Sequence, residues 1–357
     1  MRADDELLGW LLAQTSSLAV NRISYALMTM HPEVVWRTVQ WRGGKVVVLD
    51  RPHAWLDGPF YTQSAVAVVR RTLGSIRVPL VDGELPYPIC YDLRDEGCTD
   101  YVLYALPFAN GQVSYISFAS AAPGGFTDEQ LSALAALQPT FTQRLELASA
   151  YYATRALLEV YLGKNAARRV LAGAFQRGGG ELIDCAIWFS DMRGFTELAD
   201  RVEPARLIAV LDTYFDVAAS AIAANGGEVL KFIGDAVLAI FPLGEDAGAA
   251  CRSALAAAQH ALAQMADIDV GELARPQIGI ALHRGRVMYG NIGARDRLDF
   301  TVISSSVNEA SRLEGLCKTL GPLVLGEAFV RTAQVAAVDQ GLHQLKGVGE
   351  PVRVFTL

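Results

Sequence analysis

The segment Phe189-Ser190-Asp191-Met192-Arg193-Gly194-Phe195-Thr196 decides the fold of the second half of the chain. An apolar run, 183–189, interrupted only by Asp184, leads into it and is typical of a buried strand. A helical pattern follows it. The carboxylate of Asp191 therefore stands where a buried strand ends, and backbone N–H groups of the turn and helix start around Phe195 and Thr196 can hold phosphate groups.

The elements after this segment are expected in a definite order. Helical patterns cover about 204–224, 247–265 and 307–317, a turn stands at 225–227, and extended patterns cover 228–241 and 276–289. The first extended pattern reads as a hairpin. This order predicts an α+β domain in which helices pack on a mainly antiparallel sheet.

The first third of the chain predicts a separate mixed domain. A helical opening is expected at 7–30, followed by short extended runs at 36–41, 45–49 and 101–107. The run 101–107 and its neighbour 112–119 are separated by a short turn and predict a hairpin. Thr127 and Gln130 then form a capping-box pattern at the start of a long helix.

That long helix carries a repeating apolar stripe. Phe141, Leu145, Ala148 and Tyr152 are spaced by four, three and four residues, as in the seam of a coiled coil. Over so few turns the same pattern fits one amphipathic helix packed on its own domain. Both interpretations stay open at this point.

Length and composition set further limits. With 357 residues the chain can form two domains, which we place at 1–148 and 182–357 with a coupling helix and linker at 149–181. The net charge of −7 argues against binding of nucleic acid or of anionic membranes, which both need a basic surface. The five scattered cysteines fit neither a disulfide framework nor a zinc site, and no apolar span at the start is long enough for a membrane helix. We therefore expect a cytoplasmic protein.

A second acid supports a metal-dependent function. Asp235 ends the segment Lys231-Phe232-Ile233-Gly234-Asp235, at the tip of the expected hairpin. A lone Asp at such a place is more often a cap or a turn residue. Two carboxylates at strand ends, however, make a plausible magnesium pair, because Mg²⁺ takes oxygen ligands and keeps positions open for phosphate oxygens.

Four segments together resemble the signature segments of the class III adenylyl and guanylyl cyclases. They are the segment at 189–196, the segment at 231–235, Gly290-Asn291-Ile292-Gly293, and Val307-Asn308-Glu309-Ala310-Ser311-Arg312-Leu313-Glu314. The resemblance covers about half the chain. It implies a ferredoxin-like βαββαβ domain that converts ATP to cyclic AMP and pyrophosphate with two divalent metal ions, Mg²⁺ or Mn²⁺.

The resemblance also implies roles for individual residues. Asp191 and Asp235 would hold the metals, and Asn308 and Arg312 would stabilise the reacting sugar-phosphate. The last two lie four residues apart on one helix face. Without the resemblance, a surface ion pair between Arg312 and a nearby glutamate would be the simpler interpretation. In the same family Lys346, within Leu345-Lys346-Gly347, would meet the terminal phosphates.

Base recognition would fall to Lys231 and Thr301, as in the subclass in which Thr replaces the more usual Asp. A lysine can donate to adenine N1, and a threonine hydroxyl can accept from the N6 amine, so the pair favours ATP. Guanylate cyclase activity is the alternative, as is a catalytically weak nucleotide-binding module; a diguanylate cyclase would need a Glu-Phe that does not follow Gly226-Gly227-Glu228. The chain departs from the family at 304–306, where three serines stand in place of a glycine-containing loop.

Residues 1–148 resemble the GAF-like regulatory domains that precede such cyclases. The resemblance implies a sensor for an unknown small-molecule or protein signal, and a domain that only dimerises is the alternative. His31, His53, Cys90 and Cys98 lack metal-ligand spacing. Because family members build each site from two subunits, the resemblance further implies a homodimer.

Overall fold

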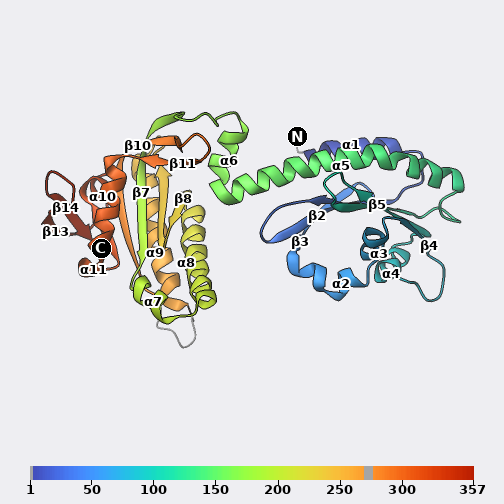
Figure 1. The fold of residues 1–357 in the computed structure, drawn as a ribbon, viewed down its shortest axis with the longest axis horizontal. Helices are drawn as coiled ribbons and strands as arrows, with labels where there is room; N and C mark the ends of the chain where they lie inside the picture. Colours follow the sequence, from blue (N-terminus) through green and yellow to red (C-terminus); the bar gives the residue numbers. More distant parts are fainter. Residues whose placement is uncertain (1–2, 269–275) are drawn as a thin grey trace. The chain divides into compact units, whose positions relative to one another are not determined.

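The computed structural model describes residues 3–268 and 276–357, and the chain divides into two compact units, Met1–Val160 and Tyr161–Leu357 (Figure 1). Each unit has a sheet and a hydrophobic core of its own.

The N-terminal unit is built on one six-stranded antiparallel sheet in the order β3-β2-β1-β6-β5-β4. Its strands are β1 (Arg22–Met28), β2 (Val34–Arg42), β3 (Lys45–Pro52), β4 (Ser75–Pro79), β5 (Asp100–Pro107) and β6 (Val113–Ser120). Helices α1 (Ala3–Thr15) and α5 (Asp128–Leu162) lie on one face, whereas η1 (His53–Asp57), α2 (Pro59–Thr62), α3 (Ala65–Thr72) and α4 (Pro88–Asp95) lie on the other (Figure 1). The predicted hairpin is β5 and β6, with Tyr101 opposite Ala119.

The predicted helical opening at 7–30 is wrong in its second half. Helix α1 ends at Thr15, and 22–28 form β1, a central strand that pairs with β2 and β6. All residues from Ile23 to Met28 are buried, and periodicity alone does not tell such a short buried strand from a buried helix segment. Pairing with β2 along the strand and with β6 at 22–25 decides the matter.

The start of α5 confirms the predicted capping box. The Gln130 amide donates to Thr127 Oγ1 at 3.2 Å, and the Thr127 amide donates to Gln130 Oε1 at 3.0 Å. Further along, Phe141 and Leu145 are buried in the core of the unit, where Phe141 stacks on Trp10 and meets Tyr25 edge to face. This part of the stripe therefore belongs to one amphipathic helix packed on its own domain.

The C-terminal unit contains a sheet in the order β13-β14-β12-β10-β7-β9-β8, with β11 paired to β10. Its strands are β7 (Gly180–Met192), β8 (Glu228–Ile233), β9 (Ala236–Pro242), β10 (Ile278–Gly293), β11 (Leu298–Ile303), β12 (Leu323–Gly326), β13 (Val338–His343) and β14 (Val352–Thr356). Its helices are α6 (Lys164–Leu171), α7 (Phe195–Arg201), α8 (Pro204–Ala224), α9 (Ala247–Asp267), α10 (Ser305–Gly315), α11 (Cys317–Leu320) and α12 (Glu327–Ala333).

The centre of this unit confirms the predicted βαββαβ arrangement. In chain order it reads β7, α8, β8, β9, α9 and β10, and the four strands lie side by side as β10-β7-β9-β8. All three pairings are antiparallel. This is the ferredoxin-like pattern.

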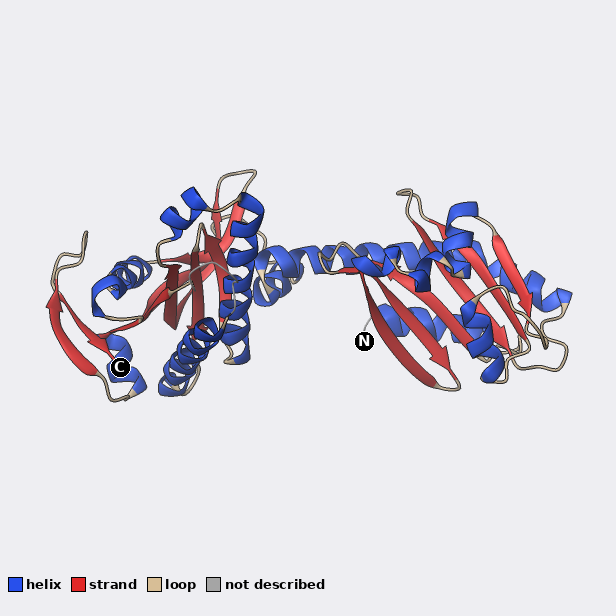
Figure 2. Cartoon of the chain, turned by 90° about the horizontal axis from the view of Figure 1, so that it is seen from below, coloured by secondary structure: helices blue, strands red, loops and turns tan. Residues whose placement is uncertain are grey.

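The two faces of the sheet are covered by different helices. Helices α8 and α9 share one core with the β7 residues Ala186 and Trp188, and α6 and α10 share another with Cys185 and Ile187. Figure 2 shows long blue helices beside the red strands of this unit. Helix α8 is long and apolar enough to cross a membrane by composition alone; however, one stripe of it, including Tyr214 and Ala218, is buried against the sheet, as in a core helix.

The end of β7 is fixed by a buried polar chain. Ser190 is fully buried, and its Oγ accepts from Trp188 Nε1 at 2.8 Å and lies 2.7 Å from the Tyr214 hydroxyl on α8. Ser190 thus anchors the strand one residue before Asp191.

We expect Ser190→Ala to lower the free energy of unfolding of the C-terminal unit by about 1–3 kcal/mol, because it leaves the Trp188 N–H and the Tyr214 hydroxyl without their shared partner. Urea denaturation followed by tryptophan fluorescence measures the change. Ser220→Ala, at an exposed position of α8, is the control and should stay within about 0.5 kcal/mol of the parent. Equal stability of both variants would contradict the anchoring role.

Candidate functional site

Two carboxylates meet at one end of the sheet. Asp191 stands near the end of β7, and Asp235 stands in the turn between β8 and β9, next to Ala236. Because β7 pairs with β9, Asp191 lies opposite Ala236. Gly234 makes the turn possible, since its φ of +64° is costly for other residues. Two segments more than 40 residues apart in sequence thus bring their acids together.

The electrostatics of this pair favour a bound cation. Burial, a hydrogen bond with Asp235 and the negative charge of Asp235 raise the pKa of Asp191 to about 7. Glu314 on α10 adds further negative charge, and burial raises the pKa of Glu314 as well. Hard oxygen donors with uncompensated negative charge are the ligands that Mg²⁺ and Mn²⁺ prefer. The two aspartates therefore fit the divalent ions that the sequence predicted.

Within 3–268 and 276–357, no group of three or more His, Cys, Asp or Glu residues forms a ready cation cage. A site of two carboxylates suits a magnesium ion that takes its remaining ligands from water and substrate phosphate.

Lys231 lies on β8, which pairs with β9, and Thr301 lies on β11, which pairs with β10. Lys231 on β8 forms an ion pair with Asp299 on β11, and Asp299 stands two residues before Thr301. Alternate residues of a strand share a face, so Asp299 and Thr301 lie on the same face of β11, while the buried Phe300 between them lies on the other. Thr301 therefore lies on the strand face that carries the ion-pair partner of Lys231, and the base-reading role of the two residues stays a prediction.

Asn308 and Arg312 share the exposed face of α10, as the spacing predicted. Arg312 has no ion pair within the described part of the chain, because Glu309 instead meets His283 on β10, with 3.3 Å between His283 Nε2 and Glu309 Oε2. A hydrogen bond from His283 lowers the pKa of Glu309. The local ion pair considered for Arg312 from sequence is thus absent.

Helix α10 is fixed at its start by the serine loop that departs from the family pattern. Ser304 is its N-cap and accepts from the Val307 amide at 3.2 Å. Ser306 packs where a Cβ on Gly285 would stand. The serines therefore cap the helix, as the sequence indicated, and the absence of a Cβ at Gly285 lets the loop lie close to β10.

The face of α10 that carries Asn308 and Arg312 points away from the acids of the same chain. At about 100° per residue, Glu314 lies about 160° around the helix from Arg312 and about 120° from Asn308. Glu314 is the buried residue whose charge acts on Asp191, whereas Asn308 and Arg312 are exposed. No hydrogen bond or ion pair described in this structure joins either of them to Asp191 or Asp235. One chain does not assemble all predicted site residues.

Phe195, Thr196 and Lys346, the remaining predicted site residues, lie on α7 and in the connection from β13 to β14. Phe195 and Thr196 open α7 directly after Gly194, which adopts a left-handed conformation. The Phe195 ring packs against the core, so only its backbone is free for a ligand, and Thr196 is exposed. Lys346 is exposed in the connection from β13 to β14. Their binding roles stay predictions.

Sequence reasoning missed three residues that position the site. Asp299 holds Lys231, His283 holds Glu309 beside Asn308, and Glu314 adds charge to the acid pair. Asp299 could have been found from its place two residues before Thr301 on one strand face. The His283 contact joins segments distant in sequence, and no local pattern announces it.

The segment 290–293 of the predicted cyclase signature has a structural role. The buried side chain of Asn291 donates to the Ala174 carbonyl at 2.7 Å, and its backbone exchanges hydrogen bonds with Gly178 and Gly179. A Cβ on Gly290 would lie 2.2 Å from the Gly179 carbonyl oxygen. This segment therefore fastens the loop before β7 to β10.

Comparison with known proteins agrees with this geometry. Residues 181–354 match the family described as adenylate and guanylate cyclase catalytic domain. An adenylate cyclase of Anabaena cylindrica is 35% identical over 184 residues, which cover 47% of this chain and 36% of that protein. Adenylate cyclase 1 of Rhizobium meliloti is 34% identical over 146 residues, which cover 40% of this chain and 22% of that protein. The chain thus spans about a third or less of the length of these curated relatives.

A solved structure of a bacterial light-regulated adenylyl cyclase matches 75% of this chain and 88% of its own, with a TM-score of 0.51 and 22% identity, a likeness of fold. The C-terminal unit belongs to the class III adenylate and guanylate cyclase catalytic domain family.

The raised pKa of Asp191 yields a stability prediction. In metal-free protein its pKa is about 7 in the folded state and near 3.9 in an unfolded chain. The folded state therefore binds more protons between these values, and its stability falls as pH rises through this window.

We expect Asp191→Asn to match the parent near pH 4 and to exceed it by about 1 kcal/mol near pH 8.5 in EDTA, a modest gain because solvent screens the half-buried carboxyl. Chemical denaturation at the two pH values measures it. Added Mg²⁺ should stabilise the parent and leave the variant unchanged. A variant less stable than the parent at the higher pH would contradict repulsion between the two acids.

Proposed function

We propose that the chain is an adenylate cyclase that converts ATP to 3′,5′-cyclic AMP and pyrophosphate at a site shared by two subunits. The observation that carries the proposal is the Asp191–Asp235 pair, set at the end of β7 in a domain of the cyclase family. Relatives named adenylate cyclase support ATP as the substrate.

In the proposed reaction, the ribose 3′-hydroxyl attacks the α-phosphorus and expels pyrophosphate. Two divalent ions held by Asp191 and Asp235 would lower the pKa of the hydroxyl and offset charge on the phosphoryl oxygens. The Arg312 guanidinium would donate to those oxygens, and the Asn308 amide would orient the ribose. Phe195, Thr196 and Lys346 would bind the β- and γ-phosphates through backbone N–H groups and an ammonium group.

A homodimer would complete the site. Asn308 and Arg312 are exposed and have no partner within the described residues, and the acid pair lies on the other side of α10. A second copy can place its α10 against the acids of the first, and a symmetric dimer then has two sites. Helix α5 adds a surface for association, because Leu147 and Tyr151 are exposed apolar residues on it.

Lys231 and Thr301 support adenine over guanine. Lys231 forms an ion pair with Asp299, two residues before Thr301 on the same strand; the ammonium would donate to adenine N1 while the Thr301 hydroxyl would accept from N6. Guanine presents the reverse pattern at these atoms, so GTP is the poorer substrate.

The N-terminal unit would regulate this activity through the coupling helix. Helix α6 is fastened to the catalytic sheet, because the Asn165 amide donates to Glu228 Oε2 at 3.1 Å and the Tyr289 hydroxyl donates to the same carboxylate at 3.0 Å. Glu228 begins β8, the strand that carries Lys231. The net charge of −7 supports a cytoplasmic enzyme without nucleic-acid or membrane partners.

Cyclic AMP formation from ATP with Mn²⁺ or Mg²⁺ tests the activity. We expect Asp191→Ala and Asp235→Ala each to lower kcat roughly 100-fold or more, because the remaining carboxylate holds the ions poorly. Asp212→Ala, at an exposed acid of α8, is the matched control and should leave kcat unchanged. GTP should give a lower kcat/KM than ATP. Full activity in both acid variants would contradict the proposal.

Complementation tests the shared site. Mixing Asp191→Ala with Asn308→Ala protein should restore activity, because one of the two sites in a mixed dimer receives neither lesion. Mixing Asp191→Ala with Asp235→Ala should restore none, because each site then lacks one acid. Subunit exchange is verified with two affinity tags. Exchange without recovered activity in the first mixture would refute the shared site.

A further inference from the structure

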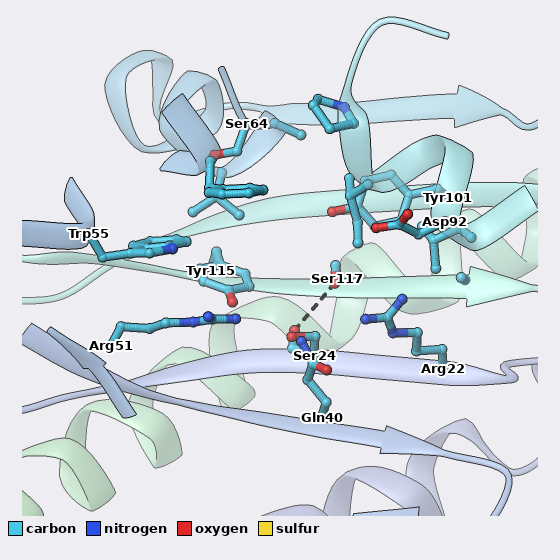
Figure 3. A pocket seen from close by; sticks show the side chains of 17 residues that line it. Arg22, Ser24, Gln40, Arg51, Trp55, Ser64, Asp92, Tyr101, Tyr115 and Ser117 are labelled. Carbon is cyan, nitrogen blue, oxygen red and sulfur yellow. Dashed lines mark hydrogen bonds between the residues drawn. The ribbon is translucent and has the colours of Figure 1, made fainter. Parts of the chain in front are cut away.

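The N-terminal unit contains a cavity of about 590 Å³. Its floor is the sheet face formed by β1, β2, β5 and β6, and its walls come from β3, η1, α2, α3 and α4 (Figure 3). The volume falls within the range of about 300–1,000 Å³ that small-molecule sites occupy. No residue of the proposed catalytic site lines it, so it needs an explanation of its own.

Arg51 brings an uncompensated positive charge to this cavity. Its guanidinium lies over the Trp55 ring, 5.0 Å from the ring centroid. Its Nε is buried and has no hydrogen-bond partner, and within the described residues Arg51 forms no ion pair. A buried charged donor left without a partner is costly. An anion bound in the cavity would supply the missing partner.

A second arginine approaches from the opposite side. In Figure 3 the side chains of Arg22 and Arg51 both extend toward Ser24 and Ser117. Arg22 has only a long ion pair, 3.5 Å to Glu96, whose other oxygen lies 2.8 Å from Arg42. Two guanidinium groups above a floor of serine hydroxyls are suited to the oxygen atoms of one anionic group.

The other residues that line the cavity set the shape of the ligand's body and its charge. Trp55, Val66, Ile89 and Leu93 provide an apolar wall, which suits a planar apolar body that can stack beside Trp55. Asp92 also lines the cavity, and its carboxylate disfavours additional negative charge. A polyphosphate would meet this repulsion several times over, whereas a monoanion carries a single charge that the two arginines can offset.

We propose that the cavity of the N-terminal unit binds a small organic monoanion with a planar apolar body, the anionic group held by Arg51 and Arg22 and the body packed beside Trp55. This site is separate from the proposed catalytic site, and its occupancy does not depend on cyclase activity.

The test uses two dyes of nearly equal shape with the full chain. The anionic probe is 1-anilinonaphthalene-8-sulfonate, and the neutral probe is N-phenyl-1-naphthylamine, which lacks the sulfonate. We expect saturable binding of the anionic dye at one site per chain, with a lower Kd than for the neutral dye. Arg51→Gln should weaken the anionic dye about tenfold, the effect of losing one charged hydrogen bond, and leave the neutral dye unchanged.

Three further variants make the result specific. Arg51→Lys, which keeps the charge, should recover part of the affinity. Arg71→Gln, at an exposed position of α3 outside the cavity, is the matched control and should change nothing. Val66→Trp should fill the cavity and block both dyes, with thermal melting verifying the fold. Equal Kd values for the two dyes, absence of saturable binding, or unchanged binding of the anionic dye to Arg51→Gln would each overturn the proposal.

Discussion

The repulsion between two carboxylates held side by side is the constraint on which the catalytic unit depends. Antiparallel pairing of β7 with β9 sets Asp191 opposite Ala236, and the sharp turn at Gly234 sets Asp235 beside it. The sheet imposes this contact, and burial, together with the hydrogen bond to Asp235 and its negative charge, raises the pKa of Asp191 to about 7. Such a shift is typical of functional sites, where a strained charge arrangement is kept because a ligand relieves it.

The core around the two acids offsets the free-energy cost of holding them together. Ser190, Trp188 and Tyr214 form a buried hydrogen-bonded chain directly beside Asp191. Gly279 leaves room for the Glu314 carboxylate, since a Cβ there would lie 2.7 Å from Glu314 Oε1. The residues next to the acids therefore act in packing, and the stability they supply offsets the cost of holding the two acids together.

The sequence predicted what local patterns encode. Apolar runs and turn residues located β7 and the hairpin of β8 and β9, and Thr127 with Gln130 marked the start of α5. It failed at 22–28, because a short, mostly apolar segment fits a strand or a helix and only pairing with β2 and β6 decides. It missed the His283–Glu309 and Lys231–Asp299 contacts, which join segments whose proximity depends on the folded sheet.

Hydrogen bonds to Glu228 connect helix α6, in the linker before β7, to the catalytic sheet. Glu228 is buried and accepts from both Asn165 and Tyr289, and burial beside this carboxylate raises the pKa of Tyr289, which keeps its hydroxyl a donor. A buried carboxylate cannot lose one donor without cost. A displacement of α6 would therefore carry Glu228 with it, and Lys231 lies three residues further along the same strand. Because Glu228 joins helix α6 to the strand that carries Lys231, a shift of the helix would change the position of Lys231 without any direct contact between the helix and that residue.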